Sequence, residues 1–276
     1  MNRHSTSPIS LTALGSKRNL PCPTNSVQTG ASHVEASAAF RYKNAEALAT
    51  FKGVYAPQGE MNEITHISDT SAGTFYDRIA RLYDWTFKVN GYRRSIERFL
   101  LAHPLPQPSG ARILDAGCGT GLLTLSLLRT LQRPAQIVAI DLSASSLLTA
   151  RRATEQRGAG RHTTSFFQAN LLSLPFADES FDFIITSGAL EYVSLDDGLR
   201  ELARVTAPGG YFLHLPVRPS PVSKLLEIIF RFRAHPVEEI VETTNRYFRI
   251  LLDHRFASFE PIGWTKIAIL ARKEGG

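Results

Sequence analysis

The chain has 276 residues, of which 43% are hydrophobic and 20% are charged, and its formal net charge is +6 at pH 7. These values fit one globular domain with an appendage, and no apolar run approaches the roughly 20 residues of a membrane-spanning helix. Cys22 and Cys118 are too few for a disulfide framework, so we expect a reducing compartment, by default the cytoplasm.

Residues 1–60 differ in composition from the rest of the chain. They are rich in Ser and Thr, have no acidic residue before Glu35, and show no periodic apolar pattern. We expect a disordered extension, with an organelle transit peptide or a true start at Met61 as alternatives. This tail carries half of the net positive charge, so the remainder is only mildly basic. That distribution argues against a nucleic-acid surface.

A glycine-rich turn follows the first strongly apolar segment. Residues 112–121, RILDAGCGTG, predict a buried strand, a tight turn and the start of a helix that continues to about residue 131. Gly117, Gly119 and Gly121 lack the Cβ atoms that would keep a bulky ligand away from the backbone. Because the first N–H groups of the helix point back into the turn, this segment predicts a cofactor site.

A second apolar strand, residues 136–141, ends in Asp141, twenty residues after Gly121. In a βαβ unit a carboxylate at this place accepts hydrogen bonds from both ribose hydroxyls, which indicates an adenosine-type ligand. The dinucleotide fingerprint requires a small residue where this chain has Leu122. A pyrophosphate-containing cofactor therefore fits poorly.

These segments resemble the first two motifs of the class I S-adenosylmethionine-dependent methyltransferases. The resemblance implies a Rossmann-like α/β fold, in which helices cover both faces of a seven-stranded mixed sheet of order 3-2-1-4-5-7-6 with an antiparallel last strand. It also implies S-adenosyl-L-methionine as the cofactor, and we expect no metal. The residues expected to bind the cofactor are Tyr76, Asp115, Gly117, Gly119, Gly121, Asp141, Leu142, Asn170, Leu171 and Ser187.

Residues 61–110 are expected to form an N-terminal helical cap. The segment 75–84, FYDRIARLYD, resembles the N-terminal helix of methyltransferases that act on quinone rings and phospholipid head groups. In such relatives this helix covers the cofactor, so Tyr76 and Tyr83 would face the sulfonium or the substrate. Aromatic residues of an ordinary core would have the same spacing. A second helical pattern starts at Tyr92, and a proline-rich linker at 104–110 follows it.

The methyltransferase core is expected to cover residues 111–276. Residues 166–170, 183–188 and 211–216 predict its third, fourth and fifth strands. The family usually has an aspartate where Asn170 stands, and an amide oxygen can still accept the adenine hydrogen bond, without the charge. Beyond the fourth strand, Glu191 could act as a base, although a glutamate at a helix start is more often exposed.

His214 is the best candidate for a catalytic residue. It lies near the end of the fifth predicted strand, where open α/β sheets bind their ligands. A histidine with an unperturbed pKa of about 6.5 could take a proton from a phenol, acid or amine. A structural histidine would look the same in the sequence.

Residues 217–255 are expected to form a helical lid insertion with two apolar-periodic helices. Lys224, Arg231 and Arg233 beside the apolar stripe suit either a solvated helix face or peripheral contact with an anionic membrane. Residues 257–262 and 266–271 then predict the closing antiparallel hairpin.

We therefore expect methyl transfer to an O, N or C nucleophile of a small, lipophilic or lipid-like acceptor. Residues 187–190, SGAL, do not resemble the Asn/Asp-Pro-Pro-aromatic motif of nucleobase methyltransferases, so no nucleic-acid partner is expected. Two alternatives remain: a methyltransferase-like binding protein without catalysis, and a NAD-linked oxidoreductase. The sequence does not indicate an oligomeric state.

Overall fold

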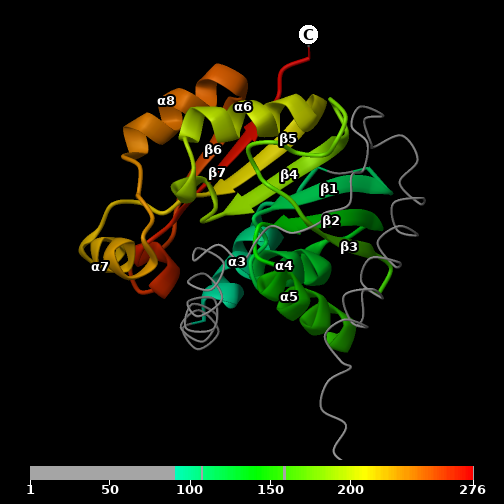
Figure 1. Cartoon of the computed structure of the whole chain (residues 1–276), viewed down its shortest axis with the longest axis horizontal. Helices are drawn as coiled ribbons and strands as arrows, with labels where there is room; N and C mark the ends of the chain where they lie inside the picture. The colour runs from blue at the N-terminus through cyan, green and yellow to red at the C-terminus, as the bar shows by residue number, and fades with distance from the viewer. Residues whose placement is uncertain (1–90, 107, 158–159, 276) are drawn as a thin grey trace, which may run out of the picture. The chain divides into compact units, whose positions relative to one another are not determined.

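The computed structural model describes residues 91–106, 108–157 and 160–275. In this part of the chain seven strands form one sheet of order β3-β2-β1-β4-β5-β7-β6, as predicted (Figure 1). The strands are β1 (Ala111–Ala116), β2 (Ala135–Asp141), β3 (Thr163–Gln168), β4 (Phe181–Ser187), β5 (Thr206–Leu215), β6 (Arg249–Arg255) and β7 (Ile267–Arg272). Neighbours among β1 to β5 are parallel, and β7 is antiparallel to both β5 and β6.

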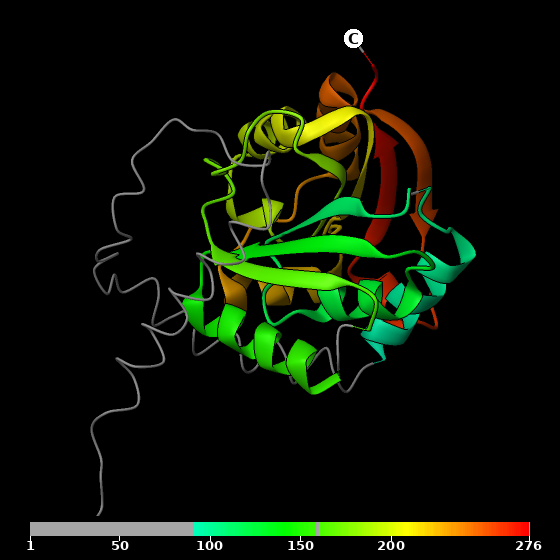
Figure 2. The ribbon, with the colours of Figure 1, turned by 90° about the vertical axis from the view of Figure 1, so that its right-hand side faces the viewer.

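Helices cover both faces of the sheet, as Figure 2 shows from the side. One layer contains α3 (Tyr92–Ala102), α4 (Leu122–Thr130) and α5 (Ala144–Arg157). The other contains α6 (Leu195–Val205) and α8 (Val237–Tyr247), while α7 (Pro221–Phe230) lies beyond the sheet at the side of β6 and β7 (Figure 1). No helix of these described segments has the length and apolarity to span a bilayer.

The central strands are apolar on both sides because a helix layer packs on each face. On β4, Ile184 belongs to the core under α6 and α8, whereas Ile185 belongs to the core over α3 and α4, and neither is exposed. The parallel pairing of β1 with β2 and with β4 places the carboxyl ends of these three strands side by side at one edge of the sheet. Segments beyond these ends are the natural ligand-binding positions of the fold.

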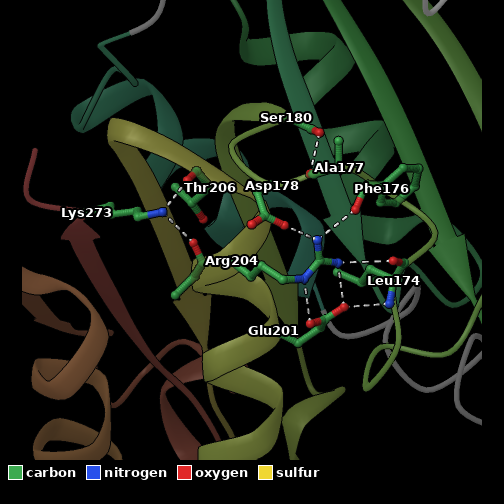
Figure 3. Close-up of polar contacts among 10 residues, drawn as sticks. Leu174, Phe176, Ala177, Asp178, Ser180, Glu201, Arg204, Thr206 and Lys273 are labelled. Atoms are coloured by element: carbon green, nitrogen blue, oxygen red, sulfur yellow. Dashed lines mark hydrogen bonds and ion pairs between the residues drawn. The ribbon is translucent and has the colours of Figure 1, made fainter. Parts of the chain in front are cut away.

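Arg204 on α6 fastens the connection between β3 and β4 (Figure 3). Its guanidinium donates to the carbonyl oxygens of Leu174 and Phe176 at 3.1 and 2.8 Å. It also pairs with Glu201 at 2.7 Å and with Asp178 at 2.7 Å. Planar guanidinium groups suit such multidentate contacts. The loop that follows β3 is thereby fixed to the helix layer.

Lys273, just after β7, caps the C-terminal end of α6. Its ammonium donates to the carbonyl oxygens of Ala203 and Thr206 at 2.9 and 2.8 Å (Figure 3). The last carbonyls of a helix have no partner within the helix, and a cation there is favoured by the helix dipole.

The closing hairpin differs from the sequence prediction. Its first strand is β6 at Arg249–Arg255, not residues 257–262, and α8 ends at Tyr247. Residues 257–260 form a turn before the 3-10 helix η2 (Pro261–Trp264). In β6 exposed and half-buried residues alternate, as expected for an edge strand with one covered face. The run Ile250-Leu251-Leu252 hides this alternation in the sequence. The fifth strand also begins earlier than predicted, at Thr206.

Candidate functional site

Three glycines shape the turn between β1 and α4. Gly117, Gly119 and Gly121 have φ angles of 75°, 52° and 86°, in the left-handed region that side chains disfavour. A Cβ atom at Gly117 would lie 2.3 Å from the Ala189 Cβ, and one at Gly121 would lie 2.9 Å from the Ala150 Cβ. At Gly119 it would meet no described atom within 4 Å. Two glycines thus permit close packing, and the third leaves an open backbone face.

Asp141 lies at the end of β2 beside this turn. Its Oδ2 accepts a hydrogen bond from the Gly119 amide at 2.8 Å, and its Oδ1 accepts one from the Ser143 amide at 2.9 Å. Burial raises the pKa of Asp141, and these amide donors oppose that increase. Because each carboxylate oxygen can accept more than one hydrogen bond, both oxygens can still receive ribose hydroxyls.

Asp115, the last acid of β1, is completely buried. Its Oδ2 accepts a 2.5 Å hydrogen bond from the Thr124 hydroxyl, and its Oδ1 has no hydrogen-bond partner among the described residues. Desolvation raises the pKa of Asp115 to about 7, and the nearby Asp141 charge adds to this. A buried acceptor without a donor next to an open glycine turn fits a ligand that carries N–H groups.

The residues expected at the adenine lie at the ends of β2 and β3. Leu142 is 56% exposed, whereas Leu171 is buried in the core under α6. The Asn170 side chain accepts a hydrogen bond from the Leu172 amide at 3.0 Å. One lone pair of that amide oxygen is therefore used by the turn, and the other can accept from a ligand.

The remaining expected residues complete the comparison with the sequence. Ser187, the last residue of β4, is half-buried at the same edge of the sheet. Tyr76 and Tyr83 lie outside the described residues, as does the predicted extension at 1–60. Every described residue expected at the cofactor thus lies at or just beyond the carboxyl end of β1, β2, β3 or β4.

His214 on β5 is buried and stacks on Phe212, with ring centroids 5.7 Å apart. Neither ring nitrogen has a hydrogen-bond partner among the described residues. Burial lowers the pKa of His214 to about 3, and the charges of Lys266 and His235 contribute. The expectation of an unperturbed pKa is therefore wrong, because the low-dielectric site penalises the imidazolium ion. The ring is neutral at pH 7.

Glu191 is buried, with only 4% of its surface exposed, and this corrects the expectation of an exposed glutamate. It lies in the 3-10 helix η1 (Leu190–Tyr192), directly beyond β4. Its Oε1 accepts a hydrogen bond from the Val217 amide, and its Oε2 has no partner among the described residues. The apolar neighbours Ala189 and Leu190 were the only sequence signal for this burial.

Lys266, immediately before β7, is also buried. Its ammonium donates to the Leu215 carbonyl at 3.1 Å. Desolvation lowers the pKa of Lys266, and the Glu191 charge opposes this change. Sequence reasoning missed Lys266 because a single lysine at a strand start is normally solvated.

A cavity of about 620 Å³ opens between the segment η1–α6 and helix α8, and Glu191 and His235 lie in its wall. Its lining includes Glu191, His235, Arg233, Val193, Leu195 and Thr243, and five more acidic or basic residues, Asp196, Glu238, Glu239, Glu242 and Arg246. The cavity provides a solvent path to the Glu191 and His235 side chains from the α8 side.

Comparison with known proteins identifies relatives that match part of the chain. Residues 113–210 match the family model described as "Methyltransferase domain". The chain is 34% identical over 186 residues to the ubiquinone/menaquinone biosynthesis C-methyltransferase of Hahella chejuensis, covering 64% of this chain and 73% of that protein. It is 35% identical over 147 residues to the demethylmenaquinone methyltransferase of Thermus thermophilus, covering 53% of this chain and 62% of that protein.

Among solved structures, one similar fold is geranyl diphosphate C-methyltransferase from Streptomyces coelicolor, in complex with Mg²⁺, geranyl-S-thiolodiphosphate and S-adenosyl-L-homocysteine. The two chains superpose with a TM-score of 0.52 at 19% sequence identity, over 64% of this chain and 74% of the other. At this identity the similarity concerns the fold alone.

Proposed function

Because the chain belongs to the class I S-adenosylmethionine-dependent methyltransferases, we propose that it transfers the methyl group of this cofactor to a small, lipophilic acceptor. The observation that carries this function is the contact between Gly119 and Asp141, which joins an open glycine turn to a carboxylate at the end of the next strand. That arrangement provides acceptors for ribose and a backbone surface for the rest of the nucleoside.

We propose specific roles for the residues at the carboxyl ends of the strands. Asp141 accepts the two ribose hydroxyls, and the buried Asp115 Oδ1 accepts from the amino-acid part of the cofactor. Asn170 and Leu171 contact the adenine, with Leu142 on its exposed side. S-adenosylmethionine supplies an electrophilic methyl group on a sulfonium. Ser187 would flank the reacting end.

His214 is proposed to bind the polar group of the acceptor. It lies next to Thr186 of β4 in the sheet, and the Thr186 hydroxyl bonds to the Ala116 carbonyl at the glycine turn. A neutral ring offers one N–H donor and one nitrogen acceptor. With a pKa of about 3 the ring cannot hold a proton at pH 7, so we assign it hydrogen bonding and not proton storage.

The lid expected at 217–255 divides into two parts. Phe230 and Phe248 are 3% and 2% exposed, and Phe248 stacks on Phe212 at 4.8 Å, so these side chains are core. By contrast α7 exposes Leu225 and Ile228 at 58% and 78%. We propose that this exposed face of α7, not the buried phenylalanines, meets the acceptor's apolar tail or the membrane in which it resides.

Basic residues accompany this apolar face. Lys224 and Arg231 are exposed on or next to α7, which suits an anionic lipid surface. Co-sedimentation with phosphatidylglycerol vesicles tests the proposal. We expect binding that is lost in Ile228→Asp and retained in the control Asp253→Asn, whose residue lies on β6. If Ile228→Asp binds the vesicles as well as the wild type does, the proposed membrane contact is wrong, while the proposed acceptor class is unaffected.

The acceptor class can be tested with isotope-labelled S-adenosylmethionine. The two quinone-pathway methyltransferases among the relatives make a short-chain demethylmenaquinol the first probe, with a long-chain fatty acid as a second and an oligonucleotide as a control. We expect label in a lipophilic probe and none in the oligonucleotide. Cofactor binding without transfer to any lipophilic probe would favour a binding protein. A redox change that requires NAD would favour an oxidoreductase.

A further inference from the structure

Four ionisable side chains are buried around the carboxyl end of β5, although they come from four separate segments. Glu191 lies in η1, His214 on β5, His235 in the α7–α8 connection and Lys266 before β7. Their exposed fractions are 4%, 1%, 7% and 2%. Charged and polar groups are rarely buried so completely unless they have partners or bind a ligand.

Several polar atoms of these four side chains lack a hydrogen-bond partner. Four side-chain atoms have no partner among the described residues: Glu191 Oε2, His235 Nε2 and both ring nitrogens of His214. The His235 Nδ1 contacts the Glu239 carboxylate at 3.1 Å and is the donor of that hydrogen bond, because a carboxylate can only accept. Of these four atoms, Glu191 Oε2 belongs to a carboxylate, which can only accept, so it is an acceptor without a donor. The neutral His214 ring offers one donor and one acceptor.

Glu191 is held in place for a ligand. The Val217 amide donates to its Oε1, and its own backbone carbonyl accepts from the Arg233 amide at 3.1 Å. Within the described residues no ion pair joins Glu191 to Lys266, whose ammonium donates to the Leu215 carbonyl. The Glu191 charge nevertheless raises the pKa of Lys266 against the effect of burial. Oε2 is thus a buried acceptor without a donor among the described residues.

We infer that Glu191 is the residue that recognises a hydroxyl group on the acceptor, with Oε2 accepting the hydrogen bond from a phenol-type O–H. This inference rests on the proposed function and names the chemistry of its acceptor. A hydroxyl group on the acceptor would donate to the unpartnered Oε2, and its oxygen could accept a hydrogen bond in turn. Tyr192 and Phe232, which follow and precede the cavity-wall residues Glu191 and Arg233 in the chain, pack with ring centroids 5.9 Å apart.

The same contact provides a place for the proton. When the hydroxyl becomes a nucleophile, its proton moves to Glu191 Oε2, the electron pair of the O–H bond stays on the acceptor oxygen, and the carboxylate becomes a carboxylic acid. The proton then leaves through the cavity that Glu191 and His235 line. His214 cannot perform this step at pH 7, because its imidazolium form is strongly disfavoured there.

Binding of 1-naphthol and of 1-methoxynaphthalene to the full chain, saturated with S-adenosylhomocysteine, tests this inference without turnover. The two probes share the ring system, but only naphthol has an O–H donor. We expect naphthol to bind at least about tenfold more tightly, as one hydrogen bond to a charged group predicts. Glu191→Gln should bring the ratio close to one, with unchanged affinity for S-adenosylhomocysteine. The control Asp196→Asn, on the same cavity wall, should keep the preference.

The outcomes separate this inference from the proposed function. Equal binding of both probes by the wild type, or an unchanged preference in folded Glu191→Gln, would overturn the role of Glu191 and leave the methyltransferase assignment intact. Binding of neither probe, while a lipophilic acceptor is methylated, would overturn it as well. If Glu191→Gln does not fold, the ratio of the wild-type affinities for 1-naphthol and 1-methoxynaphthalene still tests the inference. Failure of all methyl transfer would instead remove the proposed function.

Discussion

The Gly119 amide donates a 2.8 Å hydrogen bond to the Asp141 carboxylate and so joins the turn after β1 to the end of β2. The Ser143 amide binds the other carboxylate oxygen at 2.9 Å. Both oxygens are therefore oriented by the backbone before any ligand binds. A preorganised acceptor of this kind loses little conformational freedom when ribose hydroxyls arrive.

Removal of this carboxylate should weaken cofactor binding strongly. We predict that Asp141→Ala lowers the binding free energy of S-adenosylhomocysteine by about 2 to 4 kcal/mol, because two charge-assisted hydrogen bonds and the turn's anchor are lost. Isothermal titration calorimetry measures the effect. Asp253→Ala on β6 is the control and should bind as the wild type does. An Asp141→Ala protein within threefold of the parent would contradict the ribose assignment.

The glycines of the turn should separate into a packing role and a binding role. Alanine at Gly121 would combine a φ angle of 86° with a Cβ only 2.9 Å from Ala150, whereas Gly119 has open space above it. We predict that Gly121→Ala lowers the free energy of unfolding by about 2 to 4 kcal/mol and that Gly119→Ala lowers it by about 1 kcal/mol. Urea titration measures both.

Cofactor affinity should fall more in Gly119→Ala than in Gly121→Ala, although Gly121→Ala loses more stability. Folded Gly119→Ala should bind S-adenosylhomocysteine less tightly than the wild type, since the new methyl group projects over the open backbone face. Equal stability losses in the two variants, together with unchanged binding by Gly119→Ala, would show that the turn does not approach the cofactor.

Arg204 should contribute more to stability than the other arginine of α6. We predict that Arg204→Ala lowers the free energy of unfolding by about 1 to 3 kcal/mol, because the Leu174 and Phe176 carbonyls and the Glu201 carboxylate lose their donor. Arg200→Ala, which breaks exposed pairs only, should stay within about 0.5 kcal/mol of the parent. Similar losses in both variants, measured in urea, would contradict this assignment.

The buried Asp115 should make the stability of the cofactor-free protein depend on pH. Its pKa is raised from 3.8 to about 7 in the folded state, so between these values the folded chain binds more protons than the unfolded one. The free energy of unfolding should therefore fall as pH rises from about 4 to about 7, at most by roughly 1.4 kcal/mol per pH unit, and level off above. Asp115→Asn should remove this component. Parallel pH profiles of the wild type and Asp115→Asn in urea unfolding would refute it.

The parallel half of the fold was predictable because its signals are local. Residues 112–121 and 136–141 combine apolar strands, a glycine turn and a terminal acid, and the structure places Asp141 beside Gly119 as that pattern requires. The resemblance to a known family then supplied the strand order, which no local pattern contains.

The errors arose where tertiary packing decides the outcome. Glu191 was expected on the surface because helix-start acids are usually solvated, yet the Val217 amide and the neighbouring core enclose it. Residues 217–255 were expected to contain two helices and no strand, but the Phe248 ring stacks on Phe212 and the chain continues there into β6. The pKa of His214 depends on burial by segments distant in sequence, so only the fold could reveal it.

A single-turnover reaction followed by mass spectrometry tests the central claim most directly. The full chain is mixed with S-adenosylmethionine carrying a deuterated methyl group and with a short-chain demethylmenaquinol, and both products are quantified. Methyl transfer predicts equal amounts of S-adenosylhomocysteine and of an acceptor that contains the labelled methyl, and neither product with Asp141→Ala. An acceptor that changes only its oxidation state, with no S-adenosylhomocysteine formed, would contradict the assignment.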